Sequence, residues 1–508
     1  MRGGGPSLPY CDSVTGDYLD IAQKIEARRR QATRLRVIAI ATRGGPRRGL
    51  AALLCLLLAA CATSDISPVN GPLLPAVTTT PATLSPGPLP PDADTGIVLA
   101  FSGGGARSAA FGYGALTALA ERPSGHRGRS LADDVLVVSG VSGGAILASY
   151  YALNGPAGLE TFRRAFLDQD VEAALRTSLT PVNLLRAYQG GVNDLTGLPA
   201  WLDANLFHGA TFGDLRRASR PRLIVHATDL YNRAPFVFDQ PSFAALCSNL
   251  DGFPLSHAVA ASAAVPVVFS PIVLRNFNTA CPVGPAAQWR QLSPARSIDP
   301  ALTERDYQAA LVRYRTAPDL NFLKLYDGGL VDGLGTQSLI HLMRRGAPEP
   351  LSAAQAERLR RVVFIVVDAS TRIGGDMSRT AAGPNAIDAI VGATDAMIDS
   401  ASRHSVDALT LQAKAWRDKL VRWRCARPQH LADCASFDVE VIRIALADVT
   451  DHSRRQRILA LHNKLTLRPD DVGLVAGLGR RLLTGDPTFQ RVFAGRPRLP
   501  RGPAMARR

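Results

Sequence analysis

VLVVSGVSGGAILASYY, residues 135–151, joins an apolar, β-branched run to a run of alanine, leucine and tyrosine. The first run is typical of a buried strand and the second of a helix. Between them lies GVSGG, residues 140–144, whose glycines permit a tight reversal that side chains would block. This pattern predicts a nucleophile elbow, with the hydroxyl of Ser142 exposed at the N-terminus of the helix. The alternative is an ordinary glycine-serine turn between a strand and a helix.

A second strand, glycine loop and helix precede the serine turn. Residues 97–101, IVLAF, form a short buried-strand pattern that runs into SGGGARS at 102–108. The spacing of Gly103, Gly105 and Ser108 resembles a dinucleotide-binding loop. Two facts oppose that interpretation: the third position is a serine, and the next strand ends at the serine turn, where an acidic ribose ligand is expected.

Consecutive glycines can also present their amides to a negatively charged oxygen. We expect the N–H groups of Gly103, Gly104 and Gly105 to form an oxyanion hole, with Arg107 adding a positive charge beside it. The serine turn follows about 35 residues later as the next strand–turn–helix unit, which favours this interpretation over dinucleotide binding.

The third feature is an aspartate at a strand end. Residues 323–329, LKLYDGG, predict a strand that delivers Asp327 and then turns away. A carboxylate held in this way can take the proton of a serine directly. The alternative is a simple Asp-Gly turn. Asp368, after the strand pattern VVFIVVDA, is a rival acid, whereas we expect Asp229 to position a loop and His226 to be a core histidine.

Together these stretches resemble the patatin-like phospholipase family. The resemblance covers roughly residues 96–340 and rests on SGGGAR at 102–107, GVSGG at 140–144, AASAAVPVVFSP at 260–271 and DGGLVDG at 327–333. It implies an α/β fold with three layers, α/β/α, around a central, mostly parallel sheet, followed here by a C-terminal α/β extension.

The resemblance also implies a chemistry and its residues. Ser142 matches the nucleophile of a Ser-Asp dyad that uses no histidine, and Asp327 matches its partner. The three glycines from Gly103 to Gly105 match the oxyanion loop, with Arg107 at its basic position. The implied reaction is hydrolysis of acyl esters in phospholipids or lysophospholipids, without a metal or organic cofactor. Ser108, often glycine in the family, and Gly333, often asparagine, depart from the pattern, and we expect them to affect only the shape of the loops.

Two other functions stay open. A Ser-His-Asp esterase would need a histidine after the acid, for which His404, His452 and His462 are candidates. A non-catalytic lipoprotein of the envelope would use the same fold to bind lipid or a partner.

The distribution of charge argues against nucleic-acid binding. The chain has a net charge of +15, but residues 1–60 contribute +6, and residues 491–508 contain six arginines and no acidic residue. The remaining body carries only +3, which is not the footprint of a nucleic-acid-binding surface.

The N-terminus has the pattern of an export signal. Arginines precede LAALLCLLLAA, residues 50–60, an apolar run that is too short to span a bilayer. The run ends at Cys61 and resembles a bacterial lipoprotein signal, which implies lipidation of Cys61 after cleavage. Ala62 is not the aspartate associated with inner-membrane retention. We therefore expect a lipid-anchored protein of the bacterial cell envelope, at the outer membrane and facing the periplasm.

These features predict four parts of the chain. Residues 1–60 are a lipoprotein signal, whose length suggests a start codon assigned too early, and residues 61–95, with eight prolines after residue 61, are an extended tether. Residues 96–345 are the catalytic domain, and residues 346–508 complete the fold. The polar stretch 282–322 is a candidate lid or rim.

The cysteines fit export. Four of them remain after removal of the signal and lipidation of Cys61, an even number in an oxidising compartment. We predict disulfides Cys247–Cys281 and Cys425–Cys434, and the alternative is four buried free thiols. No clustering of cysteine or histidine suggests a metal site.

Overall fold

A computed structural model describes residues 64–494 of the protein except 74–85, 91–92, 127, 177, 179, 218–219, 282–301, 372–380, 382–385, 428–432 and 462. The predicted signal, Cys61 and residues 282–301 of the predicted lid therefore lie outside the described residues. All elements discussed below, apart from helix α6 (Pro181–Gln189), belong to one compact unit. In the part of the chain that is described, no helix has the length and apolar character needed to cross a bilayer.

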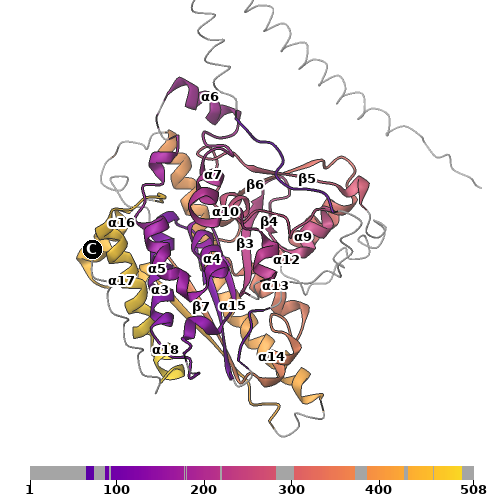
Figure 1. Ribbon diagram of the computed structural model, residues 1–508, viewed down its shortest axis with the longest axis vertical. Coiled ribbons are helices and arrows are strands. Elements are labelled where there is room, and N and C mark those ends of the chain that lie inside the picture. Colours follow the sequence, from indigo (N-terminus) through magenta and orange to yellow (C-terminus); the bar gives the residue numbers. More distant parts are fainter. Residues whose placement is uncertain are drawn as a thin grey trace, which may run out of the picture. The chain divides into compact units, whose positions relative to one another are not determined.

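An eight-stranded sheet forms the centre of this unit (Figure 1). Its order is β5-β6-β3-β2-β1-β7-β8, and β4 pairs with β3 outside this path. The strands are β1 (Thr95–Phe101), β2 (Val135–Gly140), β3 (Arg222–Asp229), β4 (Ala234–Val237), β5 (Ile272–Arg275), β6 (Phe322–Asp327), β7 (Arg361–Asp368) and β8 (Asp438–Ala445).

The larger part of the sheet is parallel. Neighbouring strands from β3 through β2, β1 and β7 to β8 run in the same direction, whereas β4, β5 and β6 pair antiparallel. Every residue of β1, β2 and β3 is buried, which is why their sequences read as continuous apolar runs instead of alternating ones. The predicted α/β fold with a mostly parallel sheet is confirmed.

Helices cover both faces of the sheet. Helices α3 (Gly105–Ala120) and α4 (Gly143–Asn154) connect β1 to β2 and β2 to β3, and right-handed crossovers place both on one face. Helix α15 (Ala386–Cys425) connects β7 to β8, where the chain moves across the sheet in the opposite direction, so it lies on the other face. There Trp416 packs edge-on against Phe364 of β7 and against Phe437.

The remaining helices surround this core. They are α5 (Leu159–Phe162), α7 (Leu198–Leu202), α8 (Phe212–Arg217), α9 (Gln240–Ala245), α10 (Leu255–Ser262), α12 (Leu302–Thr316), α13 (Gln337–Arg345), α14 (Ala353–Arg358), α16 (His452–Leu459), α17 (Pro469–Gly485) and α18 (Pro487–Val492). Short 3₁₀ and π turns connect several of them.

The part of the chain after residue 345 is built into the same sheet. Strand β7 pairs with β1 along its whole length, and β8 continues the sheet beyond β7. Helix α17 lies along α3 (Figure 1), so closely that a Cβ at Gly114 or at Gly479 would collide with the main chain of the other helix. One strand and one helix that pack beside the glycine-loop unit, β7 and α17, thus come from the C-terminal third.

The described parts of the predicted tether are bound to the body. The amides of Val69 and Leu73 donate to the carbonyls of Val273 and Cys247, and the amide of Gly87 donates to Leu136. Strand β1 begins at Thr95, one residue before the predicted start of the folded body.

Two short strands are missing from the sequence prediction. β4 and β5 contain four residues each, and β4 includes Pro235. Runs of this length have no measurable period, and a proline within them argues against a strand. Their antiparallel pairing depends on partners far away in the chain.

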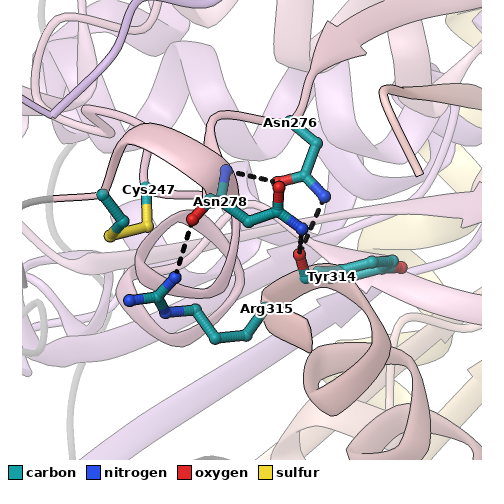
Figure 2. Close-up of a disulfide and its surroundings, with 6 residues drawn as sticks. Cys247, Asn276, Asn278, Tyr314 and Arg315 are labelled. Atoms are coloured by element: carbon teal, nitrogen blue, oxygen red, sulfur yellow. Dashed lines mark hydrogen bonds between the residues drawn. A yellow bond between two sulfur atoms is a disulfide. The ribbon is translucent and has the colours of Figure 1, made fainter. Parts of the chain in front are cut away.

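The structure contains the disulfides Cys247–Cys281 and Cys425–Cys434 that the cysteine pattern predicts. The first lies beside a cluster of amide hydrogen bonds, shown in Figure 2. The side-chain amides of Asn276 and Asn278 both donate to the carbonyl of Tyr314, at 2.7 and 3.0 Å, and Arg315 donates to the carbonyl of Asn278. These bonds fix the end of α12 to the segment that leads to the disulfide.

Candidate active site

Ser142 stands at a strained turn between β2 and α4. Its backbone has φ 52° and ψ −123°, outside the regions that a serine normally adopts. Glycines make this turn possible, because a Cβ at Gly143 or Gly144 would collide with the carbonyls of Gly105 and Ser102. Ser142 is largely buried, with 8% of the residue exposed, so the prediction of an exposed hydroxyl is wrong in this respect: neighbouring loops cover the turn. The predicted nucleophile elbow is therefore present in its strand–turn–helix setting.

One short segment holds both Ser142 and Asp327. The hydroxyl of Ser262, the last residue of α10, accepts a hydrogen bond of 2.9 Å from the amide of Ser142. Two residues later, the carbonyl of Ala264 accepts one of 3.0 Å from the amide of Asp327. The alanine-rich stretch thus brings the two candidate residues to the same place, although 185 positions separate them in the sequence.

Asp327 is the last residue of β6 and is almost completely buried. One oxygen of its carboxylate accepts a hydrogen bond of 2.8 Å from the amide of Gly329, and Thr228 donates to its carbonyl. The glycine turn after it is required, since a Cβ at Gly328 would collide with the carbonyl of His226. The strand end and this turn fix the direction of the carboxylate.

The glycine loop lies directly against the serine. A Cβ built on Gly103 would be 3.5 Å from the Cβ of Ser142. Gly104 and Gly105 have φ of 129° and 58°, which side chains rarely adopt. This backbone leaves the amides of both residues without a hydrogen-bond partner among the described residues.

The prediction that all three glycine amides serve the oxyanion needs one correction. The N–H of Gly103 already donates to the carbonyl of Gly333 at 3.0 Å, so it is not a free donor. The N–H of Gly143, which the sequence analysis did not assign, also has no partner in the described structure. The candidate donors are therefore Gly104, Gly105 and Gly143.

Two helices begin at these donors. Gly105 is the first residue of α3 and Gly143 is the first residue of α4. The two N-termini touch, because a Cβ at Gly143 would meet the main chain of Gly105. Free amides and helix dipoles at a shared point favour a negative charge there.

Comparison with known proteins agrees with this geometry. Residues 99–340 match the family model described as "Patatin-like phospholipase". We call these residues, which make up slightly less than half of the chain, the patatin-like domain. Among solved structures, human GIVD cytosolic phospholipase A2 is similar, with 13% identity and a TM-score of 0.39 over 80% of this chain and 60% of that one. VipD from Legionella pneumophila has 14% identity and a TM-score of 0.27 over 77% and 67%.

The chain therefore spans about 60% of the length of the human phospholipase chain. No curated protein sequence matched it.

Both departures from the family pattern lie at the loops around the candidate donors. The hydroxyl of Ser108 donates to the carbonyl of Ser102, which closes the glycine loop onto its own helix. The carbonyl of Gly333 accepts the Gly103 amide. The Ser108 side chain thus fixes the backbone around the donors, whereas the bond at Gly333 uses the main chain and does not depend on the residue type there.

Arg107 has a different environment from the predicted one. Its guanidinium donates to the carbonyls of Ala369 and Leu461, at 3.2 and 2.6 Å, and to the side-chain oxygen of Asn463 at 2.7 Å. Its charge still lies at the loop, because a Cβ on Gly104 would be 3.3 Å from one of its nitrogens. The hydrogen bonds, however, join the patatin-like domain to the C-terminal third of the chain.

The buried histidine of the patatin-like domain is a core residue, as predicted. Nε2 of His226 lies 2.8 Å from the hydroxyl of Ser139, which donates to the carbonyl of Gly335, and Nδ1 lies 3.5 Å from a carboxylate oxygen of Asp332. These groups resemble a Ser-His-Asp triad in order, but Ser139 is completely buried. Burial also lowers the pKa of His226, which Asp332 partly opposes. These hydrogen-bonded groups connect β2, β3 and the loop after Asp327.

The rival acids have structural partners. Asp368 is paired with Arg443 at 2.8 Å, and Asp229 accepts hydrogen bonds from the turn that follows β3 and from the hydroxyl of Tyr314. Of the candidate histidines for a triad, His452 is exposed at the start of α16. His462 and the side chain of His404 lie outside the description.

Gly105→Ala is expected to lower kcat for ester hydrolysis about 10²–10³-fold, the loss that follows removal of an oxyanion donor. A Cβ at this position would collide with the carbonyl of Lys464, and the positive φ adds strain, so the donor must move. Steady-state kinetics measure the effect. Gly473→Ala is the matched control, because a Cβ there on α17 meets nothing within 4 Å. Equal kcat in the two variants would contradict the assignment of the loop.

Proposed function

We propose that the protein is a serine acyl hydrolase that cleaves acyl esters of phospholipids or lysophospholipids through a dyad of Ser142 and Asp327. The strained backbone of Ser142, placed at the free amides of two helix N-termini, is the observation that carries the proposal. The match of residues 99–340 to the patatin-like phospholipase family model supports the substrate class.

The reaction begins with proton transfer. The carboxylate of Asp327 takes the proton of the Ser142 hydroxyl as Oγ attacks the carbonyl carbon of the acyl ester. The carbonyl oxygen becomes negatively charged, and the amides of Gly104, Gly105 and Gly143 donate to it. These donors cost no reorganisation, because glycine conformation and main-chain contacts hold them in place beforehand.

The second half releases the acyl group. The tetrahedral intermediate collapses, the bond to the alcohol oxygen breaks, and Asp327 returns its proton to that oxygen. Water then gives a proton to Asp327 and attacks the acyl-serine, and a free fatty acid leaves as the proton returns to Ser142.

Incubation of the purified protein with vesicles of phosphatidylcholine or lysophosphatidylcholine tests the proposal. Mass spectrometry of the products is expected to detect free fatty acid in amounts that increase with protein concentration and time. Absence of fatty acid release from both lipids and from short-chain esters would overturn it, and would favour a protein that binds lipid without cleaving it.

We further propose that Cys61 carries a lipid that anchors the protein in the bacterial cell envelope, at the outer membrane and facing the periplasm. The apolar run that ends at Cys61 supports this, and an anchor would place the hydrolase beside its lipids. When the full chain is expressed in a bacterial host fed a labelled fatty acid, the mature protein should become labelled. Label retained in Cys61→Ser would contradict the anchor.

A further inference from the structure

The glycine loop is in contact with a segment far beyond the patatin-like domain. Residues 463–466, which we call the C-terminal strap, lie between α16 and α17 and outside the matched residues 99–340. Asn463 and Lys464 are exposed, whereas Leu465 is buried.

The strap meets the loop on consecutive residues. The amide of Ala106 donates to the carbonyl of Lys464 at 2.7 Å. The same carbonyl lies so close to Gly105 that no Cβ fits between them. One residue earlier in the strap, the side-chain oxygen of Asn463 accepts a hydrogen bond of 2.7 Å from Arg107. The strap therefore contacts the main chain and the side chain that directly follow the candidate oxyanion donors.

The other side of the strap is fixed to the body. The amide of Leu465 donates to the carboxylate of Glu172 at 3.1 Å, and the hydroxyl of Thr466 accepts a hydrogen bond of 3.0 Å from the amide of Glu172. After the strap, α17 packs closely on α3, the helix that begins at Gly105. The strap is thus held in place independently of the loop that it contacts.

The loop itself needs such support. Within the patatin-like domain, Gly103 is held by its bond to Gly333, but Gly104 and Gly105 have positive φ, and their amides have no partner among the described residues. Glycines have the greatest conformational freedom of any residue, and a donor displaced by about 1 Å can lower a rate by about 100-fold. The hydrogen bonds of Ala106 and Arg107 with the C-terminal strap fix the other end of the glycine loop.

We infer that the C-terminal strap positions the oxyanion loop, and that Asn463 is a positioning residue acting through Arg107. This inference rests on the proposed function, because it concerns the same reaction. It assigns a part in catalysis to a segment outside the family match. Asn463 would act on the placement of the donors, because its hydrogen bond goes to Arg107 in the residues that follow them.

Asn463→Ala tests the inference with little risk to folding, since the side chain is exposed. We expect kcat for phospholipid or short-chain ester hydrolysis to fall about 10–100-fold, with KM unchanged, and the rate of labelling of Ser142 by a fluorophosphonate to fall in parallel. Asn463→Asp should restore kcat, because a carboxylate also accepts from the guanidinium. Asn205→Ala is the matched control, an exposed asparagine whose side chain makes a single hydrogen bond, to Trp201.

These measurements distinguish failure of the positioning role of Asn463 from failure of the proposed hydrolase activity. An Asn463→Ala variant with the kcat of the wild type overturns the inference and leaves the hydrolase intact. The inference is also overturned if Asn463→Asp does not restore kcat, or if Asn463→Ala lowers the unfolding temperature as well as kcat. Either result would mean that Asn463 has a structural role. A wild-type protein that neither hydrolyses esters nor reacts with the fluorophosphonate overturns the proposed function itself.

Discussion

Ser142→Ala is expected to lower the rate of phospholipid hydrolysis about 10⁶-fold, the effect of removing the nucleophile in a serine hydrolase. The amides that form the oxyanion hole remain, but without Oγ no acyl-enzyme forms. Only the small rate enhancement from substrate binding and the oxyanion hole is left. The release of fatty acid from vesicles, measured over hours, is sensitive enough to detect the residual rate.

The fold should tolerate this change. Alanine has the same backbone restrictions as serine, and no hydrogen bond among the described residues involves the hydroxyl of Ser142. We therefore expect an unchanged unfolding temperature. If the variant kept more than one per cent of the wild-type rate, another residue would be the nucleophile. Ser139, three positions earlier, is buried and bonded to the carbonyl of Gly335, and cannot replace it.

Asp327→Asn is expected to lower kcat about 10²–10⁴-fold with little change in KM, because an amide cannot take the serine proton. The shape of the site should be preserved. The oxygen of an asparagine can still accept the hydrogen bond that the amide of Gly329 donates to Asp327. Kinetics with a soluble short-chain ester avoid any effect on the binding of vesicles.

Asp368→Asn is the matched control for this substitution. Asp368 is also a buried carboxylate at the end of a strand, but it is paired with Arg443. Its replacement should leave kcat near the wild-type value. If Asp368→Asn lost activity while Asp327→Asn kept it, Asp368 and not Asp327 would be the base. That result would contradict the dyad of Ser142 and Asp327.

The strands that position the site could be predicted because their sequences are locally strong. Runs of buried β-branched residues mark β1, β2, β3 and β7, and glycines mark the turns after β1 and β2. The four-residue strands β4 and β5 have no such signal. Their existence depends on pairing with β3 and β6, which no local pattern records.

The support of the site was less predictable than its reacting groups. Ser142 and the glycine loop are recognisable because a tight turn requires particular residue types at fixed spacing. Ser262 is one small residue in an alanine-rich helix, and nothing near it in the sequence shows that its hydroxyl holds the amide of Ser142. The bonds of Asn463 with Arg107 and of Gly103 with Gly333 join residues from distant parts of the chain, so they become visible only once the sheet is assembled.

Reaction of the full chain with a fluorophosphonate, followed by mass spectrometry of its peptides, tests the central claim most directly. The reagent needs an activated serine and an oxyanion hole but no particular lipid. We expect one phosphonyl group per chain, on the peptide that contains Ser142, and no labelling of Ser142→Ala. Labelling at another serine, or no labelling of the wild-type protein, would contradict it.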